Sequence, residues 1–241
     1  GGSNLLVEDG RLDFAVVHVC SPGFSWLSRR ESNSVRVGAG LRLPVLLARC
    51  ARKGLGGLEF LAGIPGTLGG ALAGNAGAWG HNIAERVRAI SVVEPDGTFR
   101  RMNRDELSWR YRRLDLGERI IVEADLDLEP RSPELIKSRT KSLKQKKKSR
   151  HPVSQRSAGC IFKNPPGASA GELIDRCGLK GLQKGGARVS HRHANFIVNT
   201  GDASPSDVIT LMDEVKKRVK RRFGVELEAE VRHWRARPRV A

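Results

Sequence analysis

Short apolar runs separated by glycine and proline characterise the first half of the chain. The β-rich runs at 14–19 and 34–40 predict strands. The apolar spacing over 44–54, with a proline in the first turn and a glycine at the end, predicts a helix. Two β-rich runs flank a Pro-Asp-Gly turn within 88–102, which is typical of a hairpin. Residues 119–130 alternate apolar and polar side chains in their second half and predict a half-buried strand.

The second half of the chain has a stronger helical pattern. Its clearest helix covers 202–224, where Ser204 can cap the first turn and Gly224 can end the last one. The apolar side chains of this segment share one helix face: Val208, Leu211, Met212, Val215 and Val219. The remaining predicted elements are shorter, namely a helix over 170–178 and strands over 194–200 and 225–234.

These elements together predict an α+β fold with two domains. The composition changes at Pro130, after which a basic helical stretch begins. We therefore expect a first domain over residues 1–130 and a smaller second domain over residues 131–241.

The chain is strongly basic, with 43 Lys and Arg against 26 Asp and Glu and a formal net charge of +17. Much of this charge lies in 137–150 and 216–224, which could bind a polyanion or form solvated helix faces. Aromatic residues make up 5% of the chain and form no aromatic-studded basic motif, so stacking platforms for single strands are not expected. We expect no nucleic-acid partner, and the same positive field would favour a phosphorylated small molecule.

The hydrophobic and cysteine patterns indicate a soluble cytoplasmic protein without a membrane partner. No apolar run approaches the roughly 18 residues that a membrane span needs. The four cysteines are far apart and have no C-x-x-C spacing, so we expect free thiols in a reducing compartment and no metal site.

Three glycine-rich segments stand out: 1–4, 54–80 and 178–190. The longest holds ten glycines in 27 residues. Glycine lets backbone N–H groups approach phosphate oxygens, although tight turns alone also need glycine. None of the three matches a P-loop or a Rossmann fingerprint, and the longest is interpreted as a wall around a large ligand.

A single cysteine lies in SQRSAGCIFKNPPG, residues 154–167, beside a lysine, an asparagine and a Pro-Pro-Gly turn. Cys160 can be a small buried hydrophobe, because free cysteine is among the most buried residue types. Alternatively its S–H can donate a proton to a ligand. Composition does not decide between these two interpretations.

Six motifs spread over nearly the whole chain carry a resemblance to a known family: GGSNLLVEDG, LEFLAGIPGTLGGALAGNAGAWG, ELSWRYRRL, SAGCIFKNPPG, GLKGLQKGGARVSHRHANFIVNTGDAS and LEAEVR. In this order they resemble the UDP-N-acetylenolpyruvoylglucosamine reductases. The resemblance implies a flavin-binding domain of the vanillyl-alcohol-oxidase type followed by a substrate domain. It also implies the shorter type of the family, since no long insert separates Tyr111 from Arg150.

The family has a further flavin-binding stretch before GGSN. We therefore expect this chain to lack that part of the domain and to bind FAD weakly by itself.

The resemblance implies three catalytic residues, Arg112, Cys160 and Glu230. Hydride addition to an enolpyruvyl ether leaves negative charge in the carboxylate, which a cation and an acid can stabilise. Arg112 can hold that carboxylate in a planar contact, Glu230 can polarise it, and Cys160 can protonate the adjacent carbon. A thiol with a reference pKa of about 8.5 is mostly protonated at neutral pH and still acidic, so cysteine can replace the family's usual serine.

The resemblance also implies residues for the cofactor and the substrate. The cofactor-binding residues are Gly2, Ser3, Asn4, Leu5, Gly66, Gly69, Gly70, Asn75, Ala76, Gly77, Ile121 and Val122. The substrate-binding residues are Tyr111, Lys163, Asn164, His193 and Asn195. One departure is Leu114, because the family usually has serine two residues after the arginine. His191 and His193 form H-x-H, but without a third ligand at matching spacing they are interpreted as polar residues without metal.

The predicted function is reduction of UDP-N-acetylglucosamine enolpyruvate to UDP-N-acetylmuramate in peptidoglycan precursor synthesis, with non-covalent FAD as cofactor and NADPH as co-substrate. The expected partner is therefore a UDP-linked sugar, and the expected state is a monomer. Two alternatives remain open at this point. One is a flavin oxidase of the same fold acting on another substrate, and the other is a basic nucleic-acid-binding protein without catalysis.

Overall fold

The computed structural model describes residues 1–31 and 33–235, which form two compact units. The first unit comprises Gly1 and Val17–Lys147, and the second comprises Gly2–Val16 and the described part of Lys148–Ala241. Within the described residues, no helix has both the length and the apolar character that crossing a membrane requires.

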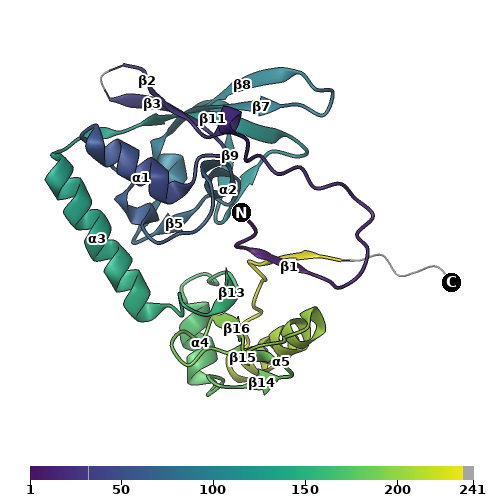
Figure 1. The fold of residues 1–241 in the computed structure, drawn as a ribbon. Helices are drawn as coiled ribbons and strands as arrows, with labels where there is room; N and C mark the ends of the chain where they lie inside the picture. The colour runs from purple at the N-terminus through teal and green to yellow at the C-terminus, as the bar shows by residue number, and fades with distance from the viewer. Residues whose placement is uncertain (32, 236–241) are drawn as a thin grey trace. The chain divides into compact units, whose positions relative to one another are not determined.

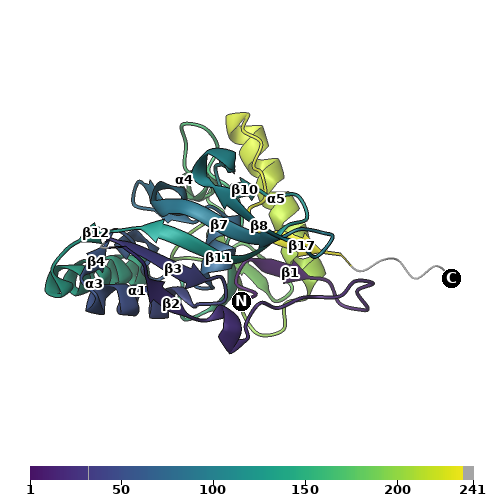
Figure 2. The same cartoon turned by 90° about the horizontal axis from the view of Figure 1, so that it is seen from above.

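The first unit is built on a five-stranded antiparallel sheet (Figures 1 and 2). In sheet order its strands are β2 (Leu27–Arg29), β3 (Ser34–Gly38), β11 (Ile120–Asp127), β7 (Val87–Val93) and β8 (Phe99–Asn103). The central strand β11 places Ala124 opposite Val37 on one side and Ile90 on the other. Three short antiparallel pairs complete its strands: β4 (Leu55–Gly56) with β12 (Glu129–Pro130), β5 (Gly77–Ala78) with β6 (His81–Asn82), and β9 (Ser108–Arg110) with β10 (Arg113–Asp115).

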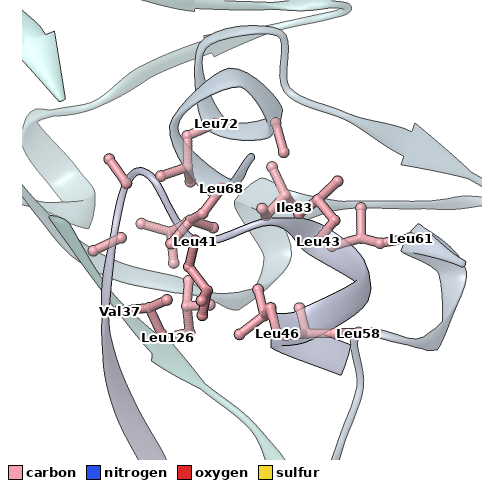
Figure 3. Close-up of a cluster of buried hydrophobic side chains, with 14 of the residues drawn as sticks. Val37, Leu41, Leu43, Leu46, Leu58, Leu61, Leu68, Leu72, Ile83 and Leu126 are labelled. Atoms are coloured by element: carbon pink, nitrogen blue, oxygen red, sulfur yellow. The ribbon is translucent and has the colours of Figure 1, made fainter. Parts of the chain in front are cut away.

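The helices of this unit are α1 (Leu43–Arg52), α2 (Leu68–Ala73), most of α3 (Pro133–Arg150), and four single 3-10 turns, η1 (Pro22–Phe24), η2 (Glu59–Leu61), η3 (Ile83–Arg86) and η4 (Arg104–Glu106). Of these, α1, α2, η2 and η3 contribute buried apolar side chains to the core. Figure 3 shows leucines of α1 and α2 meeting side chains of β3 and β11, with Val37, Leu68 and Leu126 among them. These three side chains have no exposed surface, so burial of their apolar area stabilises the unit.

The second unit has its own sheet and its own core. The antiparallel order is β13 (Arg156–Cys160), β16 (Phe196–Asn199), β15 (Ala187–Val189) and β14 (Gln183–Lys184). Two helices, α4 (Ala170–Arg176) and α5 (Pro205–Phe223), contribute buried leucine, isoleucine, methionine and valine side chains to the core. A separate parallel pair joins β1 (Leu5–Val7) to β17 (Arg232–Trp234), as Figure 1 shows.

The local sequence signals of the longest helix are confirmed. The Ser204 hydroxyl accepts the Asp207 N–H, and Gly224 ends α5 in a left-handed conformation with φ 69°. Leu211, Met212 and Val215 are buried in the unit's core. The predicted hairpin over 88–102 is confirmed as the antiparallel pair of β7 and β8.

One predicted strand is wrong, and another is shorter than predicted. Residues 14–19 form no strand, and the Val17 side chain is 74% exposed. Over 225–234, the only strand is Arg232–Trp234. β-rich composition does not make a strand unless a neighbouring chain accepts and donates the backbone hydrogen bonds.

The compact units do not follow the expected division at Pro130. The helix α3 runs without interruption from Pro133 to Arg150, and the first unit continues to Lys147 within it. The segment Gly2–Val16 joins the second unit, because β1 pairs with β17. The assignment of functions to residues 1–130 and 131–241 stays a prediction.

Candidate active-site residues

In the first unit, Arg112 lies in the turn that connects β9 and β10. Its backbone is left-handed, with φ 59°, which is uncommon for a residue with a side chain. The Arg112 Nη1 donates a hydrogen bond to the Gly77 carbonyl at 3.0 Å, and its guanidinium carbon lies 5.4 Å from the centroid of the Tyr111 ring. This bond brings two predicted site segments together and orients the cation. The Tyr111 side chain is exposed.

Asn75 fixes the strand that leads into this turn. Its Nδ2 donates to the Arg110 carbonyl at 3.0 Å, and its Oδ1 accepts the Ala84 N–H at 3.4 Å. The residue is buried and has a positive φ of 39°. Both polar atoms of Asn75 are therefore used within the protein, which favours a positioning role over direct cofactor contact.

Leu114 stands where the proteins that this chain resembles usually have a serine, and the structure shows how the leucine is accommodated. The side chain is buried in the core of the first unit. An apolar residue therefore takes part in packing at the position where the family usually has a serine.

The other predicted cofactor residues of this unit lie where backbones approach closely. The Gly69 N–H donates to the Ala39 carbonyl at 2.8 Å, and a Cβ at Gly69 would lie 3.0 Å from the Ala39 Cβ. The Gly70 N–H donates to the Thr67 hydroxyl that caps α2. The remaining members are Gly66 and Ala76, in the loops that flank α2, and Ile121 and Val122 on β11.

In the second unit, Cys160 and Glu230 belong to neighbouring chain segments. Cys160 ends β13 and is half-buried. The next residue, Ile161, accepts the Glu230 N–H at its carbonyl at 2.8 Å. Two residues further on, the Lys163 N–H donates to the Glu228 carbonyl, also at 2.8 Å. Backbone pairing thus holds the predicted proton donor and the predicted carboxylate in one local frame.

The glycine loop 2–4 contacts the same frame. The Asn4 Nδ2 donates to the Glu230 carbonyl at 3.1 Å, and the Asn4 carbonyl accepts the Arg232 N–H at 3.0 Å. Gly2 has φ 67°, and a Cβ built there would meet nothing within 4 Å. The N–H groups of residues 2–4 donate no hydrogen bond to another described residue. Successive free N–H groups in such a loop suit an anion, and Leu5 then begins β1.

Three predicted substrate residues make bonds within the second unit. Asn195 is buried, and its amide bonds both the N–H and the carbonyl of Phe162, at 3.0 and 2.8 Å. The Asn164 Oδ1 accepts the Ala170 N–H at 3.0 Å. The Lys163 Nζ lies 2.5 Å from Glu228 Oε1. These contacts fix the segment that follows Cys160.

The surroundings of His193 favour the neutral form of its ring. Its Nδ1 accepts the Asn195 N–H at 3.2 Å, so in the neutral form the proton is assigned to Nε2. Burial, followed by the charge of Lys180, lowers the pKa of His193. Its ring centroid lies 4.8 Å from that of His151 and 5.1 Å from that of Phe196. Sequence reasoning missed His151, since nothing local marks it as a neighbour.

Comparison with known proteins identifies the family of both parts of the chain. Residues 1–103 match the family model of an FAD binding domain, and residues 151–234 match that of the UDP-N-acetylenolpyruvoylglucosamine reductase C-terminal domain. The protein is thus a flavin-dependent oxidoreductase with a cofactor domain and a second, distinct domain.

Similar proteins identify the family of flavin-dependent oxidoreductases to which this chain belongs. The UDP-N-acetylenolpyruvoylglucosamine reductase of Alkalilimnicola ehrlichii is 44% identical, with 95% of this chain and 77% of the relative covered. A reductase of that name from Symbiobacterium thermophilum is 42% identical, with 98% and 77% covered. The crystal structure of the Thermus caldophilus enzyme matches with a TM-score of 0.84 at 39% identity and covers 97% of this chain and 83% of that one. The chain belongs to the UDP-N-acetylenolpyruvoylglucosamine reductase family.

Proposed function

We propose that this protein reduces UDP-N-acetylglucosamine enolpyruvate to UDP-N-acetylmuramate, with NADPH as the reductant. The observation that carries the proposal is the backbone bond between Ile161 and Glu230, since it places Cys160 and Glu230 in one frame. Family membership supports the reaction class. The domain roles follow the same proposal, with FAD in residues 1–130 and substrate in residues 131–241.

The chain offers a fitting cradle for the cofactor's diphosphate. The free N–H groups of residues 2–4, with open space at Gly2, are the donors that a phosphate group needs. Bound FAD would supply hydride transfer between NADPH and the substrate. By resemblance, the loops around α2 and the strand residues Ile121 and Val122 would contact the rest of the cofactor.

The protein's own groups then complete the reduction. A hydride added to the terminal carbon of the enolpyruvyl group leaves an electron pair on the neighbouring carbon, delocalised into the carboxylate. Arg112 stabilises that charge from the orientation that its bond to Gly77 sets. The Cys160 thiol gives its proton to the carbon that bears the ether oxygen, and Glu230, when protonated or hydrogen-bonded, polarises the carboxylate. By resemblance, the residues that would contact the substrate are Tyr111, Lys163, Asn164, His193 and Asn195.

The four cysteines differ in a way that supports this role for Cys160. Cys50 is buried in the core of the first unit, and burial raises its pKa to about 12, so it is a packing residue. Cys160 is half-buried and ends a strand beside the Glu230 segment. Cys177 is also half-buried but caps α4, which makes it a matched control for the loss of a thiol.

The decisive experiment separates the two half-reactions by stopped flow without oxygen. Cys160→Ala should leave flavin reduction by NADPH near normal and slow flavin reoxidation by substrate by about 100-fold or more, the scale of losing a positioned acid. Cys160→Ser should retain much of the rate, and Cys177→Ala should change neither half-reaction. Reoxidation of the Cys160→Ala variant at the unaltered rate would show that Cys160 is only a packing residue.

A further inference from the structure

Asn4 makes two bonds to a segment that lies 226 residues away from it in the sequence. Its side-chain Nδ2 donates to the Glu230 carbonyl, and its own carbonyl accepts the Arg232 N–H. The two bonds bracket the peptide groups that follow Glu230. Pairing of β1 with β17 begins only at Leu5 and Arg232, so the Asn4 side chain is an addition to that ladder.

Glu230 is therefore held from both sides. Its N–H donates to the Ile161 carbonyl on the Cys160 side, and its carbonyl accepts from Asn4 on the glycine-loop side. Loss of the Asn4 amide would remove this donor from the second side and would loosen the Glu230 peptide. The orientation of the Glu230 carboxylate relative to Cys160 depends on that peptide.

The residue type matches this task. The Glu230 carbonyl can only accept, so the partner must be a donor, and an asparagine amide supplies one. An aspartate of nearly the same shape would place a carboxylate against a carbonyl. The isosteric change from asparagine to aspartate thus removes the bond without creating a cavity.

We propose that Asn4 is a positioning residue that couples occupation of the glycine loop 2–4 to the placement of Glu230. The inference rests on the proposed function, because it takes the loop as the seat of the cofactor's diphosphate. An anion held by the N–H groups of residues 2–4 restrains the Asn4 backbone, and Asn4 transmits that restraint to Glu230 and Arg232. The cofactor site then prepares the acid site before substrate binds.

Hydrogen exchange on the full chain without substrate tests the coupling independently of activity. Without FAD, Asn4→Ala and Asn4→Asp keep the backbone bonds of the Glu230 and Arg232 N–H groups but loosen the peptide between them, so both amides should exchange about tenfold faster, the scale of one hydrogen bond. Adding FAD should slow exchange over 228–232 in the parent protein and should have a smaller effect in the two variants. Asn199→Ala is the control, because the Asn199 Oδ1 accepts the Gly201 and Ala203 N–H groups without touching Glu230.

The half-reactions give the functional readout. At saturating FAD, Asn4→Asp should slow reoxidation by substrate about tenfold, with an altered pH dependence of that step. Asn199→Ala should lower the melting temperature and leave this pH dependence unchanged. The coupling is overturned if Asn4→Asp and Asn199→Ala show the same exchange of the Glu230 and Arg232 amides and the same pH dependence of reoxidation. Asn4 would then have only a structural role. Failure of the parent protein to reoxidise with the enolpyruvyl nucleotide would overturn the proposed function, while the exchange experiment would still decide the coupling.

Discussion

Two glycine-rich segments, one in each unit, use glycine for different physical reasons. Between Gly66 and Gly77 in the first unit, glycines let one backbone lie against another: a Cβ at Gly77 would stand 2.7 Å from the His81 carbonyl oxygen. At Gly2 in the second unit, a Cβ would meet nothing within 4 Å, and the neighbouring N–H groups have no partner in the described chain. In the first segment, other protein atoms occupy the space beside Gly77. In the second, backbone N–H groups remain available to bind a ligand.

This difference shows that glycine content alone does not identify a ligand site. The longer segment has the stronger compositional signal, yet packing accounts for Gly69 and Gly77. The shorter loop combines a left-handed glycine with free donors and with contacts to Glu230. What separates the two is whether protein or ligand occupies the space beside the backbone.

The largest expected effect is on the packed segment. Gly77→Ala places a methyl group against the His81 carbonyl and should lower the free energy of unfolding by about 3 kcal/mol, the upper range for overpacking. Gly70→Ala is the matched control, since its Cβ would lie 3.7 Å from the Thr67 hydroxyl in ordinary contact within α2. Urea denaturation of both variants measures the contrast. Equal stability of the two would contradict the packing explanation.

A smaller effect is expected at Asn75. Asn75→Ala removes the bonds to Arg110 and Ala84 and retains an unfavourable positive φ, so the free energy of unfolding should fall by about 2 kcal/mol. Asn75→Gly removes the same bonds but tolerates the conformation, and it should be less destabilising. If Asn75 contacts the cofactor instead, both variants will lose FAD affinity in a fluorescence titration with little change in denaturation.

The smallest effect on stability is expected in the open loop. Gly2→Ala should change the unfolding free energy of the FAD-free protein by about 1 kcal/mol or less, since the only cost is left-handed strain. FAD affinity should fall roughly tenfold, because the N–H groups must hold a fixed geometry. Thermal melting and a flavin titration separate the two quantities. Unchanged FAD affinity would remove the loop from the cofactor site.

Local pattern predicted the elements whose stabilising contacts are themselves local. The cap at Ser204, the apolar face of α5 and the turn between β7 and β8 each involve residues a few positions apart. The same reasoning failed at 14–19, because a strand depends on a partner that the run itself does not contain. It also extended the final strand too far, since only three of those residues pair with β1.

The sequence by itself determined the two-part α+β organisation, the family and the identity of the candidate residues, because these follow from short patterns and long motifs. Only the tertiary structure decided how the candidates are held. Asn75 supports the Arg112 turn from 35 residues away, and Asn4 holds Glu230 from 226 residues away. An asparagine amide bonds whichever backbone group folding brings within about 3 Å, and no local pattern specifies that partner.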